Sequence, residues 1–247
     1  MKLSFVIPVY NEEMIIGECL KSVFNEIGDR KNDIEVIVVN NASTDRTKEI
    51  ALTFPGVIVV DEFKRGITWA RNTGSKIAKG DLIANTDADV LLPSGWIDKV
   101  LDEFQKDDKL VALSGPHLYR DLTVLARMNV RFFYYTGYVS HLLNMYVFKN
   151  GCMLQGGNYI LKRSALEEVG WYDGGPDFYE DTFIGSRIFR AGHVKFTFSL
   201  PIYASSRRFK KVGLFSAGLK YAINYIWILL FKKSFSKGYL HIREKNN

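Results

Sequence analysis

The chain is predicted to adopt an α/β fold with a mostly parallel central sheet flanked by helices. Two features of the first 115 residues predict this class: strand-like and helix-like segments alternate, and the strand-like segments are short apolar runs. Strands that alternate with helices form parallel sheets covered on both faces. A chain of 247 residues with 47% hydrophobic content is also long enough to bury a core, as one large or two small domains.

The expected strands of this part are mainly apolar runs at residues 3–9, 34–39, 57–60, 81–86 and 110–113. The expected helices lie between them, at residues 12–27, 45–54, 67–78 and 94–104. In the first of these helices Ile16, Leu20, Val23 and Ile27 recur at helical spacing. Ser94 is the expected N-cap of the last one.

The second half of the chain has a different character. Residues 121–148 are rich in Phe and Tyr and are expected to form one or two helices, followed by a strand at 158–162, a helix at 181–191 and a strand at 194–198. The last expected helix, at 214–231, is aromatic and apolar, but its apolar stretch is shorter than the roughly 20 residues that span a bilayer. It fits a core helix, or a helix lying on a membrane surface with Lys232 and Lys233 as anchors.

Positive charge is concentrated at the end of the chain. The net charge is +6, and residues 206–247 contain ten Lys or Arg and one Glu, which gives +9 there and −3 for the remainder. A basic, aromatic segment suits a membrane surface, acidic lipid or nucleic acid. Because no nucleic-acid-binding motif accompanies it, a membrane surface is the expected partner and nucleic acid is not.

Cysteine usage and the N-terminus indicate the cytoplasm. Cys19 and Cys152 lie far apart, without metal-ligand or redox spacing, so we expect packing residues in a reducing compartment. The N-terminal apolar run reaches Pro8 too soon to serve as a secretory signal, and we interpret it as the first strand.

Polar clusters follow three of the expected strands, at residues 8–13, 40–45 and 87–89. The carboxyl ends of parallel strands open into a ligand crevice, so the three clusters should share one edge of the sheet. In the last cluster Asp87 and Asp89 offer carboxylate oxygens that suit Mg²⁺ or Mn²⁺, although two acidic residues near a turn also fit a solvated loop or a helix cap. No glycine-rich phosphate loop follows any strand, which disfavours an NAD enzyme or a P-loop NTPase.

Together these segments resemble the family 2 glycosyltransferases of the GT-A fold, whose Rossmann-like sheet binds a nucleotide sugar. The similar segments occur in the family's order over about residues 3–208: FVIPVYNE at 5–12, VNNASTD at 39–45, ARNTG at 70–74, DAD at 87–89, GGN at 156–158 and ED at 180–181. The resemblance implies a nucleotide-sugar-binding half at 1–115, and an acceptor-binding and catalytic half at 116–208. The basic aromatic helical tail at 209–247 follows these halves.

The resemblance also implies roles for residues of the first half. Asp89 would coordinate the metal, and Asp87 would contact the ribose, the metal or a metal-bound water. Arg71 would reach the base or the phosphates, where a planar guanidinium suits anionic oxygen, unless it is a surface helix arginine. The other positions assigned to the nucleotide-sugar site are Pro8, Tyr10, Glu12, Asn40 and Asp45. The alternatives are a residue that ends the strand for Pro8, a residue at the edge of the core for Tyr10, and a favourable charge on the first helical turn for Glu12.

Asn40 departs from the family pattern, which commonly has an Asp after the second strand. An amide oxygen still accepts the imide proton of uracil, whereas guanine offers two adjacent donors and favours a carboxylate. We therefore expect a UDP-sugar as donor.

In the second half, Gly156, Gly157 and Asn158 are the expected acceptor-binding segment, because glycines let the backbone approach a sugar closely; an ordinary turn is the alternative. By resemblance, Glu180 and Asp181 are the catalytic pair, with Asp181 as the base of a single displacement that inverts the anomeric carbon. A helix N-cap is the alternative for this pair. A lipid phosphate acceptor, already ionised, would need no base.

Arg207 and Arg208 follow residues 203–206, the segment in which many relatives have a metal-binding histidine. Ser205 takes the position of that histidine here. The metal would then depend on Asp89, the diphosphate and water, with Arg207 or Arg208 offsetting the charge of the leaving group. The alternative is a solvated basic patch.

These expectations together describe a metal-dependent, inverting glycosyltransferase at the inner face of the cell membrane. Its acceptor would be a glycan or a polyprenyl-linked molecule in cell-envelope polysaccharide or glycolipid synthesis. A nucleotidyltransferase would share the fold, but it usually carries a glycine-rich basic loop after the first strand, unlike residues 8–11. A noncatalytic sugar- or lipid-binding protein is the third class, against which the joint presence of Asp87, Asp89 and Asp181 argues.

Overall fold

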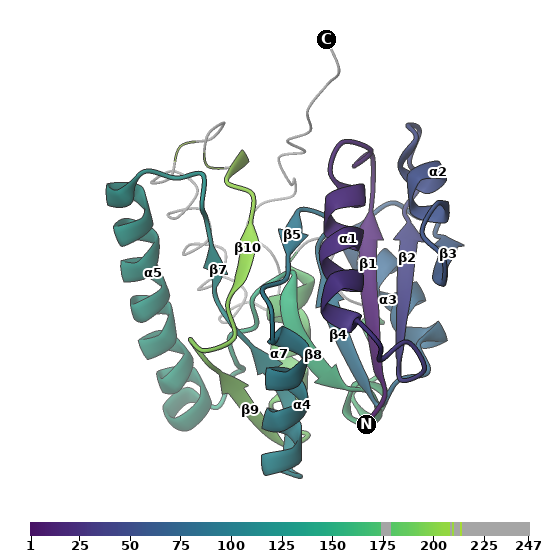
Figure 1. Cartoon of the computed structure of the whole chain (residues 1–247). Coiled ribbons are helices and arrows are strands. Elements are labelled where there is room, and N and C mark those ends of the chain that lie inside the picture. Colours follow the sequence, from purple (N-terminus) through teal and green to yellow (C-terminus); the bar gives the residue numbers. More distant parts are fainter. Residues whose placement is uncertain (174–178, 208, 210–212, 214–247) are drawn as a thin grey trace.

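The computed structural model describes residues 1–173, 179–207, 209 and 213. The expected helix at 214–231, the rest of the basic tail and Arg208 lie outside these residues. Within the described part the main sheet has seven strands in the order β3-β2-β1-β4-β8-β6-β9, with helices on both faces (Figure 1). The predicted α/β architecture is confirmed.

The strands of this sheet agree closely with the expected apolar runs. They are β1 Leu3–Val9, β2 Ile34–Asn40, β3 Val57–Asp61, β4 Leu82–Thr86, β6 Leu110–Ser114, β8 Asn158–Lys162 and β9 His193–Phe196. Strands β1 to β4 are parallel where they pair, and so are β6 and β9, whereas β8 runs antiparallel to both β4 and β6. Because β8 comes from the second half of the chain and lies between two strands of the first, both halves share one sheet.

The sheet is buried on both faces, which explains the unbroken apolar runs. Successive side chains of a strand point to opposite faces. In β1, Phe5 and Ile7 pack with residues of α1 and α4 on one face, and Val6 packs with Ile37 and Tyr159 on the other. The fully buried positions of the strands are thus shared between two apolar layers.

The helices are α1 Ile16–Ile27, α2 Thr47–Leu52, α3 Ile67–Ile77, α4 Trp96–Lys106, α5 Val124–Leu143, α6 Arg163–Glu168 and α7 Glu180–Ile188. Helix α5 continues as a π-helix, η1 Asn144–Phe148, and stands at the side of the molecule beside β7 and β10 (Figure 1). Among the described residues, no helix combines the length and apolar character needed to cross a bilayer. Cys19 and Cys152 are buried free thiols, as expected.

Helices α1 and α4 begin later than expected. Helix α1 begins at Ile16 instead of residue 12, because Ile15 has a non-helical φ of −130°. The backbone N–H groups of Glu12 and Glu13, before it, donate to the side chains of Thr47 and Asp45. Helix α4 begins at Trp96, and Ser94 is not its cap. The Glu26 carboxylate of α1 instead accepts the N–H groups of Gly95 and Ile97, at 3.1 and 3.0 Å.

A second, small sheet was not predicted. It consists of β5 Val90–Leu91, β10 Ile202–Ala204 and β7 His117–Leu118, in that order. Strand β5 follows directly after residues 87–89 and pairs antiparallel with β10. This pairing brings the segment after β10 to the acidic cluster at the end of β4.

Candidate active site

The carboxyl ends of β1, β2 and β4 meet at one edge of the sheet, at the top of Figure 1. Asn11, after β1, contacts Thr44, after β2: its side-chain oxygen accepts the Thr44 N–H at 2.7 Å, and its amide donates to the Thr44 hydroxyl at 3.3 Å. The Asp45 carboxylate accepts from Glu13 N–H and from the backbone and hydroxyl of Thr47. The structure therefore places the first two polar clusters together, with Asp45 joining them.

Arg71 does not reach this edge as an exposed side chain. It is fully buried, and its guanidinium donates from Nε to Glu180 at 3.0 Å, from Nη1 to Asn85 at 3.2 Å and from Nη2 to Asp87 at 2.7 Å. The Tyr159 ring lies 5.2 Å from it. Arg71 is therefore not a surface arginine, and it is not directed toward a base or phosphates either, because its Nε, Nη1 and Nη2 atoms all donate to side chains of the protein.

Sequence reasoning missed Asn85 and Tyr172 in this buried network. The Asn85 amide oxygen accepts from Arg71 and from the Tyr172 hydroxyl at 3.2 Å, and the Tyr172 and Tyr159 hydroxyls lie 2.9 Å apart. A polar residue inside the otherwise apolar β4 was the signal available, because a buried amide requires hydrogen-bond partners. Tyr172 gave no such local signal.

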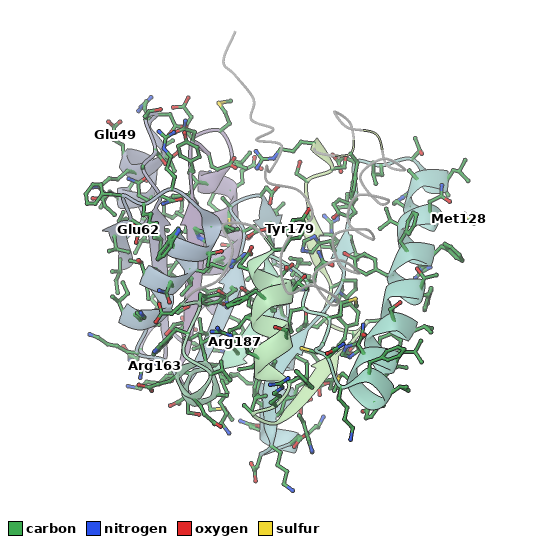
Figure 2. The ribbon with its side chains drawn as sticks, turned by 180° about the vertical axis from the view of Figure 1, so that it is seen from behind. Glu49, Glu62, Met128, Arg163, Tyr179 and Arg187 are labelled. Atoms are coloured by element: carbon green, nitrogen blue, oxygen red, sulfur yellow. The ribbon has the colours of Figure 1, made fainter. Side chains whose placement is uncertain are left out.

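Glu180 begins α7 and is buried against Arg71. Burial raises its pKa to about 7, with the negative charges of Asp181 and Asp87 adding to the effect, while Arg71 opposes it. Figure 2 shows Tyr179, the residue before Glu180, at the end of α7 that faces the site. The pair at 180–181 therefore opens a helix, whose N-terminal dipole favours negative charge.

Asp181 is half-buried, and its two oxygens have different partners. Oδ2 accepts the Gly156 N–H at 3.0 Å, and Oδ1 accepts from the backbone and hydroxyl of Thr182 at 2.6 and 3.3 Å. Burial raises the pKa of Asp181, and the hydrogen bonds from Thr182 and Gly156 work against this increase. The carboxylate is therefore held in one orientation by the backbone around it.

The two glycines contact the carboxylates. A side chain at Gly156 would lie 3.1 Å from Asp181 Oδ2, and one at Gly157, whose φ is +76°, would lie 2.7 Å from the Asp87 carboxylate. Only glycine permits both this left-handed conformation and this approach at little cost. The glycine pair thus lies against both Asp87 and Asp181.

Asn158 does not fit its predicted acceptor-binding role. Its side chain is 1% exposed and donates to the Leu200 carbonyl at 2.9 Å. It therefore fastens β8 to the segment before β10, away from any acceptor.

Asp89 lies beside Glu12 and Arg207. Arg207 donates to both oxygens of Glu12, each at 2.7 Å, and its Nε lies 3.4 Å from Asp89 Oδ2. Asp89 remains partly exposed and offers hard oxygen ligands, which fits Mg²⁺ or Mn²⁺. The described residues contain no group of three His, Cys, Asp or Glu side chains that could hold a metal, so the remaining ligands of a cation here would be diphosphate oxygens and water.

Tyr10 and Pro8 lie at the end of β1, beside β2. Pro8 pairs with Val39 in the sheet register, and the Arg65 guanidinium lies 5.0 Å from the Tyr10 ring. Asn40 is nearly buried, and its amide donates to Asp61 at 2.8 Å, while its oxygen accepts the Ser43 N–H at 3.3 Å. Asp61 was not predicted as part of the site; it stands opposite Asn40 in the pairing of β2 with β3.

Residues 4–170 match the family model described as "Glycosyl transferase family 2". The chain belongs to this family. Among curated relatives it is 26% identical over 211 residues to the probable glycosyltransferase YdaM of Bacillus subtilis, covering 79% of this chain and 48% of that protein. It is 28% identical over 177 residues to the poly-beta-1,6-N-acetyl-D-glucosamine synthase of Staphylococcus epidermidis, covering 69% and 42%. The chain spans less than half the length of each of these relatives.

Solved structures confirm the GT-A fold of this family 2 member. Staphylococcus aureus TarS 1–349 in complex with UDP-GlcNAc is 18% identical with a TM-score of 0.63, covering 83% of this chain and 59% of that one. The mannosyltransferase PcManGT of Pyrobaculum calidifontis, in complex with GDP-Man and Mn²⁺, is 22% identical with a TM-score of 0.62, covering 93% and 70%.

Replacing Arg71 by Met should lower the free energy of unfolding by about 3–5 kcal/mol, because it leaves Glu180 and Asp87 without the charge that compensates them. Urea unfolding followed by circular dichroism measures this change. Arg46→Met is the matched control, because Arg46 pairs with Glu49 on the exposed surface, where ion pairs contribute little. Equal stability of the two variants would contradict a structural role for the buried guanidinium.

Proposed function

We propose that this glycosyl transferase family 2 protein transfers a sugar from a UDP-sugar to a glycan or a polyprenyl-linked acceptor, with inversion of the anomeric carbon. The supporting observation is the Gly156-Gly157 turn, in which Gly156 approaches Asp181 and Gly157 approaches Asp87. Adjacent glycines thus approach both the proposed base and Asp87, a carboxylate proposed to bind the donor, which supports one site for the two. The curated relative named as a poly-beta-1,6-N-acetyl-D-glucosamine synthase supports a cell-envelope glycan as product.

Asp181 acts as the general base in this proposal. It removes the proton of the acceptor hydroxyl as the acceptor oxygen forms a bond to the anomeric carbon. The bond between that carbon and the diphosphate oxygen breaks, and UDP leaves with the electron pair. The raised pKa of Asp181 strengthens it as a base, and the hydrogen bonds from Gly156 and Thr182 keep its carboxylate aligned.

Asp89 would hold the divalent cation, with Asp87 beside it. When bound, Mg²⁺ or Mn²⁺ offsets the negative charge that develops on the diphosphate. Arg71 keeps Asp87 in place from inside the protein, at 2.7 Å. Arg207 lies close enough to Asp89 to contribute positive charge to the same region.

Asp181→Asn should lower kcat by about 10²- to 10⁴-fold with little change in KM, because an amide cannot take up the proton. The measurement is UDP release from a panel of UDP-sugars in the presence of Mn²⁺. Asp102→Asn, which alters an exposed pair with Lys106 on α4, is the control and should retain normal turnover. Near-normal turnover of Asp181→Asn would contradict the base and favour an acceptor that is already ionised, such as a lipid phosphate.

Asn40 supports uracil as the base of the donor. The Asp61 carboxylate only accepts hydrogen bonds, so the Asn40 NH₂ group faces Asp61 and its oxygen faces the other way. That oxygen accepts one bond from Ser43 and retains a second lone pair for the imide N–H of uracil. Lys48 bonds to the other Asp61 oxygen at 2.5 Å, which keeps this carboxylate in place.

UDP should displace a fluorescent nucleotide at a concentration at least about tenfold below that needed for GDP, a difference of roughly 1.4 kcal/mol. The two nucleotides share the diphosphate, so the comparison isolates the base. Tighter binding of GDP would overturn the assignment of the donor.

The exposed face of α5 supports an association with the inner face of the cell membrane, in the cytoplasm. The helix has no Asp or Glu, and Arg127 and Arg131 are exposed on it. Figure 2 shows Met128 projecting away from the molecule. Tyr134 and Tyr138 pack against Phe196 and hold the opposite face to the body. The exposed apolar side chains of α5 are Val124, Leu125, Met128, Phe132, Phe133, Tyr135, Val139, Leu142 and Leu143.

A cationic, apolar helix face suits an anionic membrane surface. The full chain should therefore float with liposomes that contain phosphatidylglycerol, and the triple variant Leu125→Ser, Met128→Ser, Phe132→Ser should lose at least half of this binding. Phe63→Ser is the control, because Phe63 is 84% exposed but lies outside α5. Wild-type protein that stays in the soluble fraction would refute the membrane association.

A further inference from the structure

Arg207 links two acidic residues that come from different strand ends. Its two terminal nitrogens each donate to one oxygen of Glu12, after β1, and its Nε faces Asp89, after β4. The side chains are 22% exposed for Arg207, 15% for Glu12 and 24% for Asp89. Because all three are partly withdrawn from water, the attraction between them is screened less than on an open surface.

The backbone that carries Arg207 is fastened independently of its side chain. The Ser205 N–H donates to the Asp89 carbonyl at 3.3 Å, and the Ser206 hydroxyl donates to Asp121 at 2.7 Å. Strand β10, directly before this segment, pairs with β5, directly after Asp89. The guanidinium can therefore exchange partners while its backbone stays beside the acidic residues.

The contacts that Arg207 makes with Glu12 and with Asp89, both among the described residues, differ in geometry. The contact with Glu12 is a two-pronged arrangement of short hydrogen bonds, which is the strong form of this interaction. The contact with Asp89 is longer, at 3.4 Å. The contact of Arg207 with Asp89 should therefore break more easily than its contact with Glu12.

We propose that the Arg207 guanidinium neutralises Asp89 when no ligand is bound and thereby competes with a divalent cation for this carboxylate. When a nucleoside diphosphate binds, the guanidinium leaves Asp89 and pairs with the diphosphate. The inference rests on the proposed function, because it takes Asp89 as the metal ligand and a UDP-sugar as the donor. In the absence of nucleotide, a divalent cation must compete with the guanidinium that is already paired with Asp89. A bound diphosphate provides further anionic oxygens, which can interact with the divalent cation and with the guanidinium.

Binding of the metal and the nucleotide should therefore be coupled. Thermodynamic linkage requires that UDP strengthens Mn²⁺ binding by the same factor by which Mn²⁺ strengthens UDP binding. Part of this factor exists in any site where a diphosphate ligates the metal. The additional part, due to Arg207, disappears when the guanidinium is removed.

The test is a titration with MnCl₂, with and without UDP, followed by electron paramagnetic resonance of free Mn²⁺. Arg207→Gln should bind Mn²⁺ in the absence of UDP about tenfold more tightly than the wild type, which is about 1.4 kcal/mol. Its coupling to UDP should be smaller than that of the wild type. Arg207→Lys keeps the charge without the planar fork and should lie between the two.

Controls separate the local effect from the loss of one positive charge. Arg30→Gln removes the same charge at the distant pair with Asp98 and should bind Mn²⁺ like the wild type. Adding Asp89→Asn to Arg207→Gln should abolish the gain. The proposal is overturned if neither Arg207 variant binds Mn²⁺ more tightly than the wild type, or if the gain survives Asp89→Asn. Because no sugar transfer is measured, failure of the proposed reaction would be seen separately, in the assay of UDP release.

Discussion

A single buried positive charge connects the two halves of the candidate site. The Arg71 guanidinium, on α3, bonds to Asp87 at the end of β4 and to Glu180 at the start of α7. A charge that is withdrawn from water must be compensated by hydrogen-bonded partners of opposite sign. The positions of the β4 end and of the α7 N-terminus are therefore tied to each other, and the turn at Gly156 completes the connection by binding Asp181.

Two arginines offset the negative charges around this edge of the sheet. The buried Arg71 pairs with Asp87 and Glu180, and the partly exposed Arg207 pairs with Glu12 and Asp89. Asp181 has backbone and hydroxyl donors as partners. Acidic groups can thus gather in a small region without a bound ligand, and among them Asp89 has the longest contact with a guanidinium, at 3.4 Å.

The sequence predicted most of the main sheet, because long apolar runs with helices between them are a local pattern. It also predicted that the polar clusters share one edge, which follows from parallel strands alone. The small sheet was beyond this reasoning, since β5 and β7 have two residues each and pair with a strand far along the chain. The position of Arg71 was missed for a similar reason: its partner Glu180 lies 109 residues away, and nothing near Arg71 indicates burial.

The reversed strand β8 has a consequence for the way in which the chain assembles. Strands β4 and β6 are not neighbours, because β8 lies between them and pairs with both. Ser114 in β6 pairs with Tyr159 of β8, so the partner strand of β6 is synthesised well after β6 itself. Until that segment emerges from the ribosome, β4 and β6 expose unpaired backbone edges, which are prone to pair with other chains. The late arrival of β8 therefore makes these two edges the part of the sheet most open to pairing with other chains before folding is complete.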